Sequence, residues 1–187
     1  TQRILAMKPS IYKKGGAGMK IQYGISRCTL GYVLAAFTDR GVCAVELGDD
    51  SGSLIHVLKE RFDKAEIQPL SDEISTDVQT VVDCIDHPGK AVAIPVDIRG
   101  TAFQEKVWRT LIKIPLGETR TYSQVAAEIG RPKAARAVAN ACADNRIAVA
   151  VPCHRVIRED GGLGGYRWGL ERKEKLLKME REHITGE

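Results

Sequence analysis

The sequence predicts an α/β domain followed by a mainly helical domain that contains a helix-turn-helix. Short runs rich in β-branched and aromatic residues, separated by turn signals, occupy the first half. In the second half apolar residues recur at helical spacing, and a glycine-containing turn joins two of these segments. The charge also changes, from 11 Lys+Arg against 13 Asp+Glu up to residue 98 to 17 against 11 beyond it. We therefore expect a linker over 1–19, an α/β domain over 20–98 and a second domain over 99–187.

The first domain is expected to open with three strands and two helices. Residues 1–19 are basic and contain Gly-Gly-Ala-Gly, which interrupts regular structure and is typical of a linker. The strands follow at Ile21–Ser26, Tyr32–Thr38 and Val42–Leu47. Asp50 can cap a helix whose apolar face carries Leu54, Ile55, Leu58 and Phe62. A second helix is predicted from about Ser71 to Ile85, and the run AVAIPVDI over 91–98 is predicted to form a strand.

The second domain is expected to consist mainly of helices. Thr101 can cap a helix with an apolar stripe of Phe103, Val107, Leu111 and Ile114. A short helix follows over about Ser123 to Ile129, and Arg131-Pro132 opens another that runs to about Asn145. Helix, tight turn and second helix form the helix-turn-helix pattern. The second helix of this pattern is rich in alanine around Arg136. It can therefore lie close to a DNA backbone or, alternatively, pack in an ordinary helical bundle.

Composition excludes several classes of protein. No apolar run approaches the roughly 18 residues of a membrane span, and no signal-peptide pattern opens the chain, so we expect a cytoplasmic protein. The basic second half favours a polyanionic partner, although a solvated basic surface would show the same charge. No CxxC pair or zinc-finger spacing is present, so we expect no metal, no cofactor and no disulfide framework. The cysteines are Cys28, Cys43, Cys84, Cys142 and Cys153.

The sequence VAVPCHRVI, residues 149–157, is the strongest indication of chemistry. Its first apolar residues are typical of a short buried strand, which Pro152 would end because it lacks an amide proton. Cys153 then comes directly before His154 and Arg155, two side chains that can carry positive charge and favour a thiolate. This environment predicts an activated nucleophile at Cys153.

Each residue of this motif can also have a purely structural role. A cysteine is commonly a small core residue, which is the role we expect for the other four. Adjacent side chains on a strand point to opposite faces, so contact between His154 and Cys153 requires a turn or a bridging water. Asn145 ends the preceding helix, and its side chain can clamp a neighbouring turn.

Four motifs together resemble the O6-alkylguanine-DNA alkyltransferases. These motifs are TYSQVA, RPKAARAVANACADN, PCHRVI and GGLGGYRWGLERKEKLL, and the resemblance extends from about Ile21 to His183. The stretch MKPSIYKKGG resembles the end of an AraC-type DNA-binding domain, as in the bacterial adaptive-response members of this family. The resemblance implies a ribonuclease H-like α/β domain followed by a winged-helix domain.

The resemblance also implies a role for each residue around the reaction centre. Cys153 is similar to the cysteine that accepts the alkyl group, and His154 to the histidine that takes its proton through water. Glu180 is then the carboxylate that orients the histidine, and Asn145 the hinge that braces the cysteine loop. Tyr122 is similar to the tyrosine that donates to the departing guanine and crowds the DNA phosphate.

Further residues are implied to contact DNA and the damaged base. Arg136 resembles the arginine that fills the gap left by the flipped nucleotide, while Lys133 and Ala135 lie beside it at the interface. The substrate pocket is expected to include Val156, Tyr166, Arg167 and Trp168. Trp168 stands where several relatives have a small residue, and we expect its indole to narrow the entrance beside Cys153.

The function implied by the resemblance is single-turnover DNA repair, in which Cys153 takes the alkyl group from a flipped-out guanine. The expected partner is double-stranded DNA with O6-alkylguanine, or O4-alkylthymine as a further substrate, bound by a monomer without any membrane. Two alternatives remain: a Cys-His-Asn thiol hydrolase built from Cys153, His154 and Asn145, or an inert damage-sensing module. Multiple turnovers would favour the hydrolase, whereas members without chemistry lack the accepting cysteine.

Overall fold

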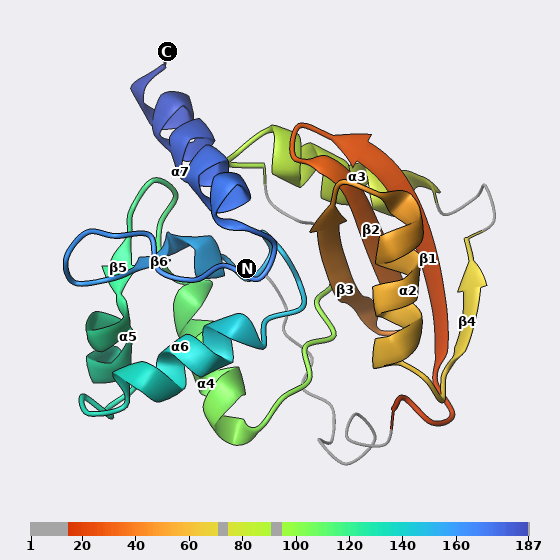
Figure 1. Cartoon of the computed structure of the whole chain (residues 1–187), viewed down its shortest axis with the longest axis horizontal. Coiled ribbons are helices and arrows are strands. Elements are labelled where there is room, and N and C mark those ends of the chain that lie inside the picture. Colours follow the sequence, from red (N-terminus) through yellow and green to blue (C-terminus); the bar gives the residue numbers. More distant parts are fainter. Residues whose placement is uncertain (1–14, 71–74, 91–94, 187) are drawn as a thin grey trace. The chain divides into compact units, whose positions relative to one another are not determined.

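The chain folds into two compact units, Thr1–Gly100 and Thr101–Glu187, each described by itself below. The structure is a computed structural model, and it describes residues 15–70, 75–90 and 95–186 (Figure 1). The linker predicted over 1–19 lies mostly outside the described residues. Met19, at its end, is buried and belongs to the core of the first unit.

A four-stranded mixed sheet forms the centre of the first unit (Figure 1). Its strands are β1 (Lys20–Cys28), β2 (Gly31–Thr38), β3 (Gly41–Gly48) and β4 (Glu66–Pro69), in the order β3-β2-β1-β4. The first three pair antiparallel, as consecutive strands joined by short turns favour, and β4 pairs parallel to β1. The sequence analysis missed β4, because this short edge strand is largely exposed and carries no apolar alternation.

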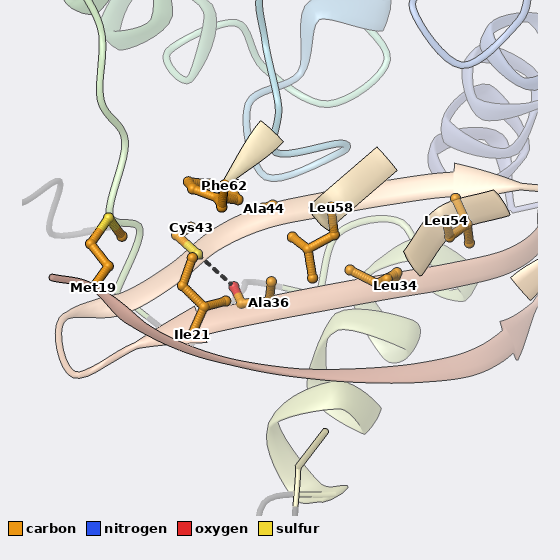
Figure 2. Close-up of a cluster of buried hydrophobic side chains, with 9 residues drawn as sticks. All are labelled: Met19, Ile21, Leu34, Ala36, Cys43, Ala44, Leu54, Leu58 and Phe62. Carbon is orange, nitrogen blue, oxygen red and sulfur yellow. Dashed lines mark hydrogen bonds between the residues drawn. The ribbon is translucent and has the colours of Figure 1, made fainter. Parts of the chain in front are cut away.

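Helix α2 (Ser51–Arg61) covers one face of this sheet. It begins where predicted, since the carboxylate of Asp50 accepts from Ser53 N at 2.7 Å. The helix buries Leu54 and Leu58 in a cluster with side chains from β1, β2 and β3 (Figure 2). Cys43 belongs to this cluster and donates from Sγ to Ala36 O at 3.4 Å. Burial raises the pKa of Cys43 to about 12, which supports its interpretation as a core residue.

Helix α3 (Ser75–Asp86) packs against β1 and β2 on the other face of the sheet (Figure 1). Gly24 permits this close approach, because a Cβ there would lie 2.6 Å from Val78 Cγ2. Residues 71–74, where this helix was predicted to begin, lie outside the described residues. The same is true of 91–94 in the predicted strand over 91–98. From the described part of that segment only Val96 forms a bridge, parallel to Val42.

The second unit is mainly helical. Helix α4 (Ala102–Leu111) begins at a capping box, in which Thr101 and Gln104 each accept the other's backbone N–H, at 3.2 and 2.8 Å. Its predicted apolar stripe is buried at Val107 and Leu111. Trp108 connects it to a later helix, because its indole N–H donates to Ala141 O at 2.8 Å.

Two short helices follow and enclose a tight turn. Helix α5 (Tyr122–Glu128) is followed by Ile129 and by Gly130, which has a φ of 73°, and helix α6 (Ala135–Ala143) packs against α5. The prediction that α6 begins at Arg131-Pro132 is wrong by about one turn. Ala134 N donates to Arg131 O at 2.8 Å, so the residues between them form a separate turn before the helix.

The remaining elements surround the cysteine motif. A 3-10 helix covers Cys153–Arg155, and β6 (Val156–Ile157) pairs parallel to β5 (Arg120–Thr121). The long helix α7 (Leu170–Thr185) ends the unit and contacts the 3-10 helix. No helix in the described part of the chain has the length and apolar character that crossing a membrane requires.

Candidate functional site

Asn145 fixes the loop that precedes Cys153. Its amide Nδ2 donates to Val151 O at 2.8 Å and to Cys153 Sγ at 3.1 Å, while its Oδ1 accepts from Ile147 N at 3.0 Å. The residue is 1% exposed, so water does not compete for these bonds. The structure thus places Asn145 as a brace between the end of α6 and the cysteine.

The strand predicted before Pro152 is a turn instead. Val151 N donates to Ile147 O at 3.1 Å, and Val149 has a φ of 65°, a left-handed conformation that a β-branched residue rarely adopts. The cost of such a conformation is of order 1–3 kcal/mol, which the bonds from Asn145 help to offset. The apolar pattern correctly indicated burial, because Val151 is fully buried, but burial alone does not distinguish a turn from a strand.

The 3-10 helix directs Cys153 and His154 into different environments. Both residues are buried, at 3% and 0% exposure. The imidazole Nε2 of His154 lies 2.7 Å from Glu180 Oε1 on α7, whereas Cys153 Sγ accepts from Asn145. Among the described residues no direct Cys153–His154 hydrogen bond is formed, so proton transfer between them requires a bridging group.

Glu180 is the centre of a buried ionic network. Arg155 donates to both of its carboxylate oxygens at 2.9–3.1 Å and also to Ile114 O at 2.6 Å. Gly117 N adds a further donor at 3.2 Å. Burial would raise the pKa of Glu180, but the bonds from His154 and Arg155 outweigh it and lower this pKa to about 2. Glu180 is therefore ionised and holds the imidazole in place.

The protonation of His154 follows from this network. Burial lowers its pKa more strongly than Glu180 raises it, so the net direction is downward and the ring is neutral at physiological pH. Because the ionised carboxylate can only accept, Nε2 carries the proton and Nδ1 is left as an acceptor. The geometry therefore provides a base whose second nitrogen is free to take a proton.

The charge around Cys153 differs from the sequence expectation. The neighbouring cations were expected to favour the thiolate, but Arg155 and His154 are engaged with Glu180. Burial raises the pKa of Cys153 to about 11, although Asn145 and Lys173 act in the opposite direction. The resting residue is a buried thiol that must lose its proton during reaction.

Lys173 is a buried residue beside the site that was not predicted from the sequence. Its ammonium is buried and donates to Val156 O at 2.5 Å, to Leu163 O and, more distantly, to Gly165 O at 3.4 Å. Lys173 thereby connects residues 161–167, which we call the glycine-rich loop, to β6. It also keeps a positive charge near Cys153. Nothing in the charged segment LERKEKLL distinguished this lysine from its solvated neighbours.

A cavity of about 280 Å³ opens beside Cys153. Its lining comes from α5, α6, the cysteine and the glycine-rich loop: Tyr122, Ala139, Cys142, Ala143, Cys153, Gly165, Tyr166 and Arg167. The loop passes close to Tyr122, because a Cβ on Gly164 would lie 2.9 Å from the Tyr122 hydroxyl. Burial raises the pKa of Tyr122 to about 12, so its hydroxyl stays a hydrogen-bond donor.

The lining confirms neither Val156 nor Trp168 as a pocket residue. Val156 is fully buried and is not part of the cavity lining. Trp168 is 5% exposed and packs edge-on against Tyr166, with 5.1 Å between ring centroids. Trp168 thus packs behind Tyr166, a residue of the cavity wall, and the expectation that its indole narrows the entrance stays a prediction. Cys142, by contrast, was expected to be a core residue only, yet it borders the same cavity as Cys153.

Helix α6 connects the cavity to the molecular surface. Arg136 is exposed, and Ala139 and Ala143, at i+3 and i+7 from it, line the cavity on the same helical stripe. Lys133 is exposed in the turn before the helix, and Ala135 is partly buried at its first position. The structure therefore brings Arg136 to the helix face that leads into the cavity, where the alanines leave room for a ligand.

We expect the Cys153 thiol to stay protonated at neutral pH and to ionise only as the pH approaches about 11. A buried thiolate lacks solvation, so the ionised form becomes populated only at high pH. The thiolate absorbance of the wild type minus that of Cys153→Ser measures this titration. An apparent pKa below that of an ordinary cysteine would contradict the electrostatic description of the site.

Comparisons with known proteins support one family. A family model described as 6-O-methylguanine DNA methyltransferase, DNA binding domain, matches residues 102–182. The chain is 45% identical over 179 residues to the bifunctional transcriptional activator/DNA repair enzyme Ada of Escherichia coli K12, covering 96% of this chain and 51% of that protein. It is 56% identical over 90 residues to a methylated-DNA–protein-cysteine methyltransferase of Mycolicibacterium paratuberculosis, covering 48% and 54%. The chain thus spans about half the length of these curated relatives.

The solved structures that resemble this chain support the same family. The crystal structure of Mycobacterium tuberculosis O6-methylguanine methyltransferase matches with a TM-score of 0.71 and 33% identity, covering 87% of this chain and 94% of that one. That of Mycobacterium tuberculosis OGT in complex with DNA matches with a TM-score of 0.70 and 31% identity, covering 88% and 94%. The chain therefore belongs to the O6-methylguanine-DNA methyltransferase family. This confirms the predicted order of a mixed-sheet α/β part and a mainly helical part.

Proposed function

We propose that the chain repairs DNA by moving the alkyl group of O6-alkylguanine onto Cys153, once per molecule. One observation carries this proposal: a buried thiol borders a cavity, while the next residue is a neutral imidazole held by an ionised glutamate. A nucleophile, a base and a group that orients the base are the parts an activated thiol requires. The family relatives, named for methyl transfer to protein cysteine, support the same reaction.

The proposed reaction is a single displacement. The Cys153 proton passes through a water molecule to His154 Nδ1, and the sulfur electron pair attacks the alkyl carbon. The carbon–oxygen bond breaks, its electrons stay on guanine, and Tyr122 donates a hydrogen bond to the departing base. Because the resulting thioether has no good leaving group, the thiol is not regenerated and each chain reacts once.

The proposed substrate is a nucleotide rotated out of duplex DNA. The reacting carbon lies inside the base stack, so extrusion is needed and costs about a few kcal/mol. Arg136 would fill the space that the base leaves, Lys133 and Ala135 would lie against the backbone, and Tyr122 would crowd the phosphate. The stripe from Arg136 to Ala143 supports this, since it joins the surface to the cavity.

The finer structural and cellular assignments are part of the proposal. We assign the first unit to the ribonuclease H-like folds and the second to the winged-helix folds, with the division near residue 99. The protein is expected to act as a monomer in the bacterial cytoplasm, near the nucleoid, with O4-alkylthymine in DNA as a further substrate. The backbone at Tyr166 and Arg167, two residues that line the cavity, would contact the damaged base.

The alternative of a thiol hydrolase is not favoured by the geometry. A Cys-His-Asn hydrolase needs an asparagine that orients the histidine, but Asn145 donates to the cysteine itself. The group that orients His154 is Glu180. The presence of Cys153 in the cavity likewise disfavours a damage sensor without chemistry.

We expect Arg136→Ala and Tyr122→Ala to slow repair of duplex DNA much more than reaction with the free alkylated base. Both residues are assigned to extrusion of the nucleotide, a step that a free base does not need. Duplex affinity should also fall with salt, because phosphate contacts release counterions. Single-turnover rates on a methylated duplex and on free O6-methylguanine measure the difference.

The matched control for the arginine is Arg109→Ala, which removes the same charge from an exposed position on α4. It should leave both rates unchanged. If Arg136→Ala and Tyr122→Ala reduced both rates equally, these residues would shape the pocket and would have no role in extrusion.

A further inference from the structure

Two buried polar atoms in the described part of the chain have no protein hydrogen-bond partner: His154 Nδ1 and Tyr166 Oη. Their rings approach edge to face, with 6.4 Å between centroids and 83° between planes. A buried polar group without a hydrogen-bond partner is destabilising, so native structures contain few of them. The presence of two such atoms on neighbouring rings indicates that one ligand forms hydrogen bonds with both.

The two atoms have complementary hydrogen-bonding character. His154 Nδ1 is an acceptor, because Nε2 carries the proton toward Glu180. Tyr166 is a donor, because burial and the nearby Cys153 raise the pKa of its hydroxyl well above the ordinary value. Packing against Trp168 holds the Tyr166 ring in place. A small molecule that both accepts and donates would satisfy the two atoms together.

Cys153 lies at the same place. Tyr166 and Cys153 line one cavity, and His154 follows Cys153 in the 3-10 helix. The sulfur already accepts from Asn145, so its own S–H can be donated elsewhere. Three polar groups, two donors and one acceptor, are therefore available to a ligand here, and a buried water molecule usually makes about three hydrogen bonds.

We propose that Tyr166 is a positioning residue, whose hydroxyl holds the water that carries the proton from Cys153 to His154. This inference rests on the proposed function, since it concerns the same reaction. The water accepts from the Tyr166 hydroxyl and the Cys153 thiol and donates to His154 Nδ1. As the sulfur attacks, the thiol proton moves to the water, and a water proton moves to Nδ1. Tyr166 keeps its own proton throughout.

The charged groups around this relay come from three elements. Arg155 from the 3-10 helix, Arg167 from the glycine-rich loop, and Arg172, Lys173 and Glu180 from α7 act on Cys153, His154 or Tyr166. A Tyr166→Phe substitution alters none of these charges. A change in the pH dependence of this variant would thus report on the hydroxyl alone.

The test compares two electrophiles in Tyr166→Phe, which keeps the ring and removes only the hydroxyl. Iodoacetamide alkylates a thiol with loss of iodide and needs the same proton transfer, but it contains no guanine. We expect both iodoacetamide alkylation and methyl transfer from a methylated duplex to slow about tenfold or more at neutral pH, equivalent to roughly 1.4 kcal/mol. The rate of the variant should then recover with rising pH, toward the thiol pKa of about 11.

The controls separate this role from others. Tyr32→Phe removes a tyrosine hydroxyl in the first unit and should leave both rates and the pH profile unchanged. Slower methyl transfer with a normal iodoacetamide rate and pH profile would place the Tyr166 hydroxyl against the base and overturn the proposal. Unchanged rates with both reagents would also overturn it.

A second measurement does not depend on the variant being folded. A high-resolution crystal structure of the wild type should show one ordered water within hydrogen-bond distance of Tyr166 Oη and His154 Nδ1. An ordered site without that water would overturn the proposal. Failure of the proposed function would appear separately, as wild-type protein that takes no methyl group from DNA while the iodoacetamide comparison still reports on Tyr166.

Discussion

Cys153→Ser is expected to abolish alkyl transfer while leaving binding to duplex DNA unchanged. A serine hydroxyl is a far weaker nucleophile than a thiol, and His154 is not arranged as its direct base, because the histidine forms no hydrogen bond with residue 153 in the described structure. The oxygen is also smaller than sulfur, so the fold should tolerate the change. Transfer of a labelled methyl group from duplex DNA to protein, beside a binding titration, measures both effects.

The matched control is Cys142→Ala, which removes the other thiol that borders the cavity. Burial raises the pKa of Cys142. The histidine that Glu180 orients follows Cys153 in the chain, not Cys142. This variant should still accept one methyl group. Residual transfer in Cys153→Ser, or a methyl group found on Cys142 of the wild type, would contradict the assignment of the acceptor.

Glu180→Gln should slow methyl transfer by about 10²-fold or more, within the range of general acid–base catalysis. The carboxylate raises the proton affinity of His154, and its removal leaves a weaker base in a buried site. The substitution also leaves Arg155 without its ionic partner, so the free energy of unfolding should fall. Single-turnover rates and urea denaturation, run on the same samples, separate the two effects.

The pH dependence of stability gives Glu180 a second signature. Its folded pKa of about 2 lies below the ordinary value of 4.5, so its stabilising contribution is present above about 4.5 and is lost as the pH falls toward about 2. Glu180→Gln should flatten this part of the acid-denaturation curve. Glu182→Gln, on the same helix but in a largely exposed pair with Lys178, should change neither the rate nor the curve. Equal behaviour of the two variants would remove Glu180 from the mechanism.

Local sequence signals predicted the regular elements well because each has a short-range cause. Asp50 and Thr101 cap the helices that they were expected to cap, since capping depends on residues three positions apart. The first three strands were also predicted, because each is a short run of residues with high β-propensity between turn residues. The turn before Pro152 was missed, since it is made by the Asn145 side chain, which hydrophobic periodicity does not reveal.

The site was less accessible to sequence reasoning, because its chemistry depends on distant contacts. His154 and Glu180 lie 26 positions apart in the sequence but 2.7 Å apart in the structure, and only the family resemblance indicated that glutamate. The expectation that neighbouring cations activate Cys153 was wrong, because both are committed to Glu180. Lys173 and Trp168 show the same limit: the fold, and not the local sequence, decides which charged or aromatic side chain is buried at the site.

The most direct test of the proposed function is the intact-protein mass after incubation with excess O6-methylguanine duplex DNA. We expect each chain to gain the mass of one methyl group, located on the peptide that contains Cys153, and then to remain inactive toward fresh substrate. A mass that stays unchanged while the DNA loses its methyl groups would show catalytic turnover. That result, or repair beyond one equivalent, would contradict the assignment of Cys153 as a single-use acceptor.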